Sequence, residues 1–333
     1  MGASVGYRLR LTALGLIVFF APFAPAQDTA PVQQEQKPAQ EQVSQPFPDV
    51  LKPETPVKTE FTEDELRDLV RRAMENDQAN YRQQKDLTHV ERQQVEHLDG
   101  KGNVKKTETV TKEILILYGD RMERVIERND QPLSAEEKKK EDAKFDKEVA
   151  RLQKESPEDR QKRIDKYEEQ SRKAREFVVE VSKAFNFKFE GEESVNGRPA
   201  YVITGDPRPD YKPTTREGKI LSKTRGRMWI DVASTHWVKL DAEFTDTMSF
   251  GWFLARVRPG TRVMVEQKLF RDDVWVPEKI NFNLDARVGV FKQLFQNIDV
   301  TFRDWRKFSS DARILDYSEI EQKPAPASAS PQQ

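Results

Sequence analysis

The residues that could carry out chemistry are few and poorly placed for it. The chain contains three histidines, His89, His97 and His236, and no cysteine. His89 and His97 stand in one strand-like run, which would hold them about 27 Å apart when extended, so they cannot share a metal ion. His236 lies beside a turn with no nucleophile near it in the sequence. We therefore expect it to be a surface residue.

Serine and carboxylate chemistry is also weakly supported. The stretch "MSFGW" lacks the first glycine of a nucleophile elbow, and no glycine-rich loop carries the lysine of a phosphate-binding loop. The carboxylate pairs Asp272–Asp273 and Glu192–Glu193 lie at turns, where carboxylates more often cap backbone amides than transfer protons. These patterns predict a chain that is not an enzyme and that holds no metal and no cofactor.

The charge balance disfavours a nucleic-acid partner. The chain of 333 residues has 56 basic and 57 acidic side chains, a formal net charge of -1, and both signs are interspersed. Proteins that bind nucleic acid rely on a basic excess gathered on one surface. The sequence therefore predicts no nucleic-acid binding.

The first 26 residues are typical of a secretory signal. Arg8 and Arg10 precede the apolar run "LTALGLIVFFAPF", and the small residues Ala24-Pro25-Ala26 follow, which predicts cleavage after Ala26. The run is shorter than the roughly 20 residues that cross a bilayer, so we expect no stable transmembrane anchor. An uncleaved anchor is the alternative. Without a cysteine, the chain cannot accept a lipoprotein lipid. The expected location is the periplasm.

Composition divides the rest of the chain. We expect a disordered spacer rich in Pro and Gln at 27–60 and a disordered tail at 321–333, because neither can bury enough apolar surface to fold. Between them, 61–132 and 186–320 read as two parts of one strand-rich unit. The charged segment 133–185 has apolar residues three to four apart and starts helices at Ser134 and Ser156, so it predicts an inserted helical hairpin.

A short amphipathic helix and about eleven antiparallel strands are expected outside that hairpin. Thr62 and Glu65 fit a capping box, and Leu66, Leu69, Val70 and Met74 share one face, which predicts a helix over 62–75. A sheet of this many strands curls or closes. The predicted strands cover 81–98, 103–118, 120–130, 187–194, 199–204, 225–232, 236–246, 248–257, 261–271, 274–287 and 290–307.

Alternation along these strands gives the sheet one apolar face. Trp237, Lys239, Asp241 and Glu243 should point away from that face. With the helix at 62–75 and the charged hairpin as its cover, the expected fold is mainly β with helices, an incomplete antiparallel barrel. An ordinary core is the simpler interpretation of the same pattern. The residues that we assign to this face are Val238, Leu240, Phe244, Val263, Val265, Leu269, Ile280, Phe282, Leu284, Ile298, Val300 and Phe302.

The segment from "GRMWIDVASTHWVKLDAEF" to "VTFRDWRKF" resembles the outer-membrane lipoprotein-sorting family of the LolA and LolB type. The matching elements are Trp229-Ile230-Asp231, Lys239, the strand and bend from Gly251 to Gly260, Trp275 with Pro277, Arg287, and Trp305 to Phe308, and the likeness extends over roughly 99–308. The resemblance implies an eleven-stranded half-barrel plugged by helices. The hairpin at 133–185 and the Pro/Gln-rich spacer depart from the simple carriers.

The resemblance also implies a function. Its apolar concavity would hold the acyl chains of a lipoprotein or lipid, with Leu66, Leu69, Val70 and Met74 as a lid, and its partners would include the sorting machinery of the inner and outer membranes. The alternative is an envelope sensor or assembly scaffold that transports nothing, because one fold supports several roles. The lipidated receptor type is disfavoured because its cysteine is missing.

Overall fold

One open antiparallel sheet organises the molecule. The computed structural model describes residues 60–84, 87–117, 120–250, 255–271, 274–288 and 292–307. Within these ranges thirteen strands form a single sheet in the order β4-β3-β2-β1-β13-β12-β11-β8-β7-β6-β5, and β9 and β10 pair beside β12. The outermost strands, β4 and β5, do not pair with each other, so the barrel stays incomplete. The predicted fold class is confirmed.

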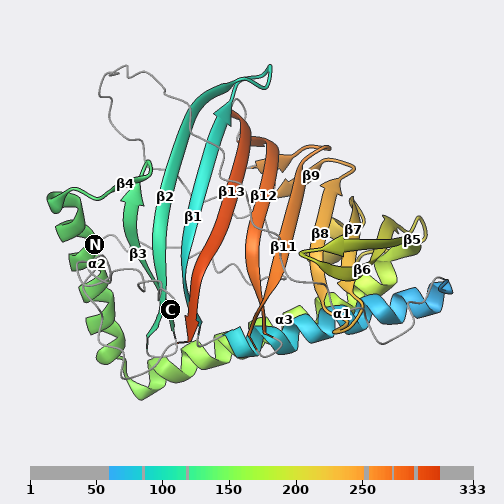
Figure 1. Cartoon of the computed structure of the whole chain (residues 1–333), viewed down its shortest axis with the longest axis horizontal. Coiled ribbons are helices and arrows are strands. Elements are labelled where there is room, and N and C mark those ends of the chain that lie inside the picture. The colour runs from blue at the N-terminus through green and yellow to red at the C-terminus, as the bar shows by residue number, and fades with distance from the viewer. Residues whose placement is uncertain are drawn as a thin grey trace, which may run out of the picture.

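Four long strands, β2, β1, β13 and β12, lie side by side in the sheet and curve along their length (Figure 1). The strands are β1 Leu87–Leu98, β2 Val104–Leu117, β3 Asp120–Arg128, β4 Gln131–Pro132, β5 Phe185–Val195, β6 Arg198–Pro207, β7 Thr224–Asp231, β8 Trp237–Phe244, β9 Met248–Phe250, β10 Ala255–Val257, β11 Arg262–Arg271, β12 Val274–Val288 and β13 Lys292–Lys307. The count exceeds eleven because β4 was not expected and the run 248–257 contains two short strands, β9 and β10.

Helices α1 Glu63–Gln83, α2 Ala135–Gln153, α3 Pro157–Ala184 and α4 Arg216–Leu221 accompany the sheet. Helices α1 and α3 lie side by side across one end of the strands, whereas α2 stands beside β3 (Figure 1). Phe145 and Leu152 of α2 pack on Met122 of β3, and Val178 and Val181 of α3 join the cluster that contains the apolar face of α1. The two helices of the charged segment therefore cover different parts of the sheet.

Helix α1 starts where the sequence predicted and ends later. The Thr62 hydroxyl accepts a hydrogen bond from the Glu65 amide, and the Glu65 carboxylate accepts one from the Thr62 amide at 2.8 Å, which completes the capping box. The helix continues to Gln83, so 81–83 are helical rather than part of the first strand. Its last turns bury Asp77 and Asn80. Because the inward positions of these turns carry polar residues, the apolar period that predicts a helix ends before the helix does.

The predictions at both ends fall outside the described residues. The signal segment with its cleavage at Ala26, most of the spacer and the tail are not among them, and neither are 251–254, between β9 and β10, or Phe308. Among the helices that are described, none is both long enough and apolar enough to cross a membrane.

Candidate functional site

The candidate site is the apolar layer between α1 and the sheet. Leu66, Leu69, Val70 and Met74 of α1 have exposed fractions of 3%, 4%, 1% and 5%, and Ala73 lies between them at 0%. They form one cluster with the last turns of α3 and with side chains of β6, β7, β8 and β11. In this conformation the side chains of α1 themselves occupy the apolar face of the sheet.

Most of the face residues that alternation assigned lie in this layer or beside it. Val263 and Val265 are members of the cluster under α1, and Leu240, Ile280 and Phe282 pack against it. Phe244 and Leu284 form a second cluster with Ile220 of α4, which Phe282 also contacts. The face therefore continues from α1 to α4.

Three further face residues lie on β13, on the other side of β12. Ile298 pairs with Phe282 and Val300 with Ile280, so they share the face of their partners. Val300 and Phe302 are buried and Ile298 is half-buried. None of the three belongs to the cluster under α1, so the structure places them at the margin of the site.

The assignments of Val238 and Trp237 to their faces were wrong. Val238 packs with Trp229 and Trp275 on the opposite face, and Trp237 joins the cluster under α1. The cause is a register shift: Trp229 pairs with Lys239, whereas Ile230 pairs with Trp237, so one extra residue of β8 interrupts the alternation. From Leu240 onward the predicted faces apply.

Leu269 does not line a buried cavity. Its exposed fraction is 39%, whereas Gln267, two residues earlier on the same face, is fully buried. The cover of the face by α1 therefore ends between these residues, and the last position under it carries an amide rather than an apolar side chain.

A buried polar cluster fixes the C-terminal half of α1, and no pattern in the sequence pointed to it. Asn80 donates to the Trp275 carbonyl at 2.8 Å and accepts from the Trp275 amide at 2.9 Å. Asp77 accepts from the Gln267 amide at 3.2 Å, and Gln267 also donates to the Trp237 carbonyl at 3.3 Å. Asp77, Asn80 and Gln267 have exposed fractions of 4% or less. Buried polar groups of this kind stabilise one arrangement of α1, because breaking their hydrogen bonds would leave buried donors and acceptors without partners.

His236 belongs to this cluster and is buried, contrary to our expectation of a surface histidine. Its exposed fraction is 3%, its ring stacks on Trp275 with centroids 5.4 Å apart, and its Nε2 lies 3.6 Å from the Asp77 carboxylate. That separation is too long for a hydrogen bond. Burial lowers the pKa of His236 to about 4, against a hydrogen bond with Gln267 and the charge of Asp231. The imidazole is neutral at pH 7.

Asp77 should make the stability of the protein fall as pH rises. Burial raises the pKa of Asp77 to about 7, despite hydrogen bonds with Gln267 and Trp237, from an ordinary value of 3.8. The folded protein therefore retains this proton between pH 4 and pH 7, whereas the unfolded chain loses it. The contribution of Asp77 to the free energy of unfolding is consequently largest at low pH and declines across this window.

The variant Asp77→Asn tests this linkage. The wild type, compared with Asp77→Asn, is expected to lose stability steadily from pH 4 to pH 7 in urea unfolding followed by circular dichroism. The comparison cancels the opposite contributions of His236 and His89, which both proteins share. A difference in the free energy of unfolding between the two proteins that stays constant across this range would show that Asp77 is ionised in the folded state.

His89 is buried in an aromatic environment at the margin of the site. Its ring stacks on Trp305 at 4.0 Å between centroids and lies 5.7 Å from Phe302. Burial, and then the charge of Arg121, lower the pKa of His89 to about 3. Neither ring nitrogen of His89 has a hydrogen-bond partner among the described residues. His97 instead bonds Glu108 at 2.9 Å.

The described residues contain no group of histidines and carboxylates arranged to hold a metal ion. Glu193 accepts a hydrogen bond from the Trp229 indole at 2.8 Å, which gives it a structural partner. Asp272 and Asp273 lie outside the described residues. The arrangement consists of packed apolar side chains and buried hydrogen bonds.

No protein-family model matches the chain, and no curated protein matches it. Solved structures with similarity to it include an outer membrane lipoprotein-sorting protein domain from Vibrio parahaemolyticus (12% identity, 76% of this chain and 98% of that chain, TM-score 0.30). A DUF1329 family protein from Desulfovibrio piger has 11% identity over 74% of this chain and 93% of that chain, with a TM-score of 0.27. A LolA superfamily protein from Nitrosomonas europaea has 8% identity over 67% of this chain and 86% of that chain, also with a TM-score of 0.27. The TM-scores are low, and the fold described above rests on the chain's own strands and helices.

Proposed function

We propose that this chain binds the acyl chains of a lipoprotein or lipid between helix α1 and the apolar face of its open sheet. It would act in the periplasm as a carrier or chaperone in outer-membrane lipoprotein sorting or envelope biogenesis. The observation that supports the proposal most directly is the amphipathic helix α1, whose apolar side chains occupy a continuous apolar sheet face that ends in two unpaired edges.

In this proposal, helix α1 reduces the net free energy of acyl binding. Each buried methylene contributes about 0.8 kcal/mol, so a sixteen-carbon chain would gain on the order of 12 kcal/mol before ordering costs. A carrier that bound this tightly would not release its cargo. Displacing Leu66, Leu69 and Val70 from the sheet offsets much of that gain, because their own burial is lost when the ligand enters.

A second candidate is a sensor or scaffold whose apolar layer stays closed. The bidentate bond between Asn80 and the Trp275 backbone, which fixes one half of α1 to the sheet, favours it. The two candidates are separated by acyl chains that co-purify with the protein from its native envelope. Their detection by mass spectrometry after solvent extraction is expected of a carrier and not of a scaffold.

Hydrogen exchange should show the displacement of α1. On addition of an acylated peptide, amides between Leu66 and Met74 are expected to exchange faster, because the ligand takes the place of their side chains. Amides around Phe145 in α2 serve as the control, since α2 packs on β3 outside the site. Unchanged protection of α1 in a sample saturated with the peptide would count against the proposal.

A further inference from the structure

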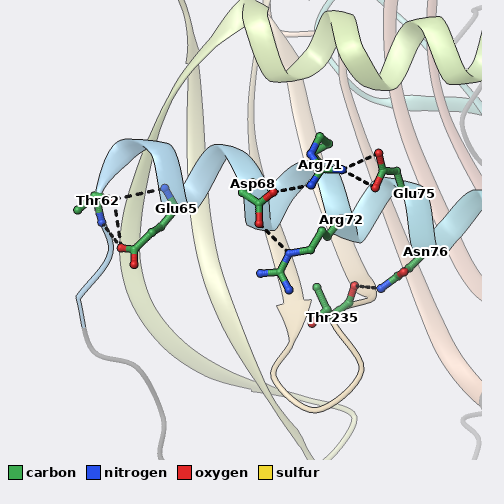
Figure 2. A network of polar contacts seen from close by, with 8 residues as sticks. All are labelled: Thr62, Glu65, Asp68, Arg71, Arg72, Glu75, Asn76 and Thr235. Carbon is green, nitrogen blue, oxygen red and sulfur yellow. Dashed lines mark hydrogen bonds and ion pairs between the residues drawn. The ribbon is translucent and has the colours of Figure 1, made fainter.

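The two halves of α1 are held to the sheet in different ways. Asp77 and Asn80 fix the C-terminal half through buried hydrogen bonds to β11 and β12. The N-terminal half contacts the sheet through apolar side chains, and its hydrogen bond from Arg67 goes to the Ser182 carbonyl of α3. Figure 2 shows that the outward face of this half carries ion pairs within the helix itself, such as Arg72 with Asp68 at 2.9 Å. The buried hydrogen bonds described above therefore join the C-terminal half of α1 to the sheet, whereas the N-terminal half packs on the sheet through apolar side chains.

Two open hollows flank the start of this half, on either side of Phe61. One, of about 450 Å³, lies between α1 and the edge strand β5 and is lined by Glu60, Phe61, Glu63, Leu66, Asn186, Phe187, Lys188 and Phe189. The other, of about 370 Å³, is lined by Phe61, Asp64, Glu65, Asp68 and Arg72.

The floor of the larger hollow is continuous with the apolar layer under α1. The Phe61 ring lies 5.0 Å from that of Phe189 and 5.1 Å from that of Tyr201. Phe61, Phe187 and Phe189 are half-buried and pack against the cluster that contains Leu66. Apolar contacts therefore run without a break from Phe61 to the cluster under α1.

The rim of the hollows is acidic. Their lining contains five acidic side chains and two basic ones, namely Glu60, Glu63, Asp64, Glu65 and Asp68 against Arg72 and Lys188. Neighbours that pair with or face these groups bring the totals to eight acidic and five basic side chains, the additions being Glu75, Glu190, Asp210, Arg67, Arg71 and Arg208. Such a rim repels phosphate and carboxylate groups and attracts cations.

We propose that the space between the N-terminal half of α1 and edge strand β5, around Phe61, is the portal through which acyl chains enter, and that its acidic rim selects acylated peptides whose polar end is neutral or basic. The C-terminal half of α1 stays docked as the hinge. This inference rests on the proposed function. It adds the route of the ligand and a preference among acyl-bearing molecules.

The position of the portal can be tested with single cysteines, because the chain has none of its own. Asp64→Cys lies at the portal and Gln83→Cys at the opposite end of α1, and both side chains are exposed. Each variant carries a small fluorophore and is titrated with an N-acylated peptide whose acyl chain bears bromine, a contact quencher. Quenching at 64 and not at 83 is expected. Equal quenching at both positions, or quenching at 83 alone, would overturn the proposed route.

The charge preference is tested with two acylated peptides that differ only in carrying lysines or glutamates after the acylated residue. We expect the lysine peptide to bind more tightly in low salt and Glu60→Lys to reduce this preference about two- to fivefold. Glu158→Lys, an equally exposed charge reversal in the first turn of α3, is the matched control and should leave the preference unchanged.

The outcomes separate this inference from the proposed function. If both peptides bind equally, or if vesicles of anionic phospholipid compete better than the lysine peptide, the acidic rim has no selective role and the charge preference is wrong while acyl binding stands. If neither acylated peptide binds the wild type, the proposed function itself fails. Circular dichroism of each variant confirms that it has the wild-type fold.

Discussion

Leu69→Ala is expected to lower the free energy of unfolding by about 2–5 kcal/mol and, at the same time, to tighten the binding of an acylated peptide. Leu69 is 4% exposed and packs among the residues of the sheet face. Its truncation weakens the closed arrangement, which competes with the ligand for that face. Each 1.4 kcal/mol by which closure is weakened makes binding about tenfold tighter, until the closed state is no longer the major one.

Leu152→Ala is the matched control for this variant. Leu152 is fully buried in the separate cluster formed by α2 and β3, so the same substitution should destabilise the protein similarly without changing acyl affinity. Urea unfolding and titration with a fluorescent acylated peptide measure the two quantities. A Leu69→Ala protein that is less stable and also binds the peptide more weakly would contradict the competition between Leu69 and the ligand for the sheet face.

Asp231→Ala should destabilise the fold by about 3 kcal/mol, the lower end of the range for breaking a buried ion pair, because Arg198 keeps a third of its surface exposed. Asp231 is 1% exposed at the end of β7. It accepts hydrogen bonds from Arg198 Nε at 2.7 Å and from the amide and hydroxyl of Ser234, both at 2.8 Å. Its loss leaves the guanidinium and the turn before β8 without their acceptor.

The pH dependence of Asp231 has the opposite sign to that of Asp77. Burial alone would raise the pKa of Asp231, but the hydrogen bonds from Arg198 and Ser234 outweigh it and lower the pKa below 3.8. The contribution of Asp231 to the free energy of unfolding is therefore complete above pH 3.8 and is lost as pH falls through the lowered pKa. Asp210→Ala, which removes an exposed pair with Arg208, is the control and should leave the urea midpoint unchanged. Equal midpoints for both variants would contradict this account of Asp231.

The sequence by itself determined the fold class, the start of α1 and most of the apolar face. Local patterns carry these features: a capping box at Thr62 and Glu65, a helical period through Leu66, Leu69, Val70 and Met74, and alternation over parts of β11 and β12. Such patterns can be recognised in the sequence because the face on which a side chain lies follows from its own position along a helix or strand. Alternation failed at Val238, where a register shift between β7 and β8 breaks it.

Only the tertiary structure decided how the face is closed. Asp77, Asn80, His236 and Gln267 come from segments as many as 190 residues apart and meet under the C-terminal half of α1. Each is polar and would be assigned to the surface by its type, because burial of a polar group is favourable only when a specific partner satisfies it. The same dependence on distant partners explains why the length of α1, the burial of His236 and the hollows around Phe61 could be seen only in the folded chain.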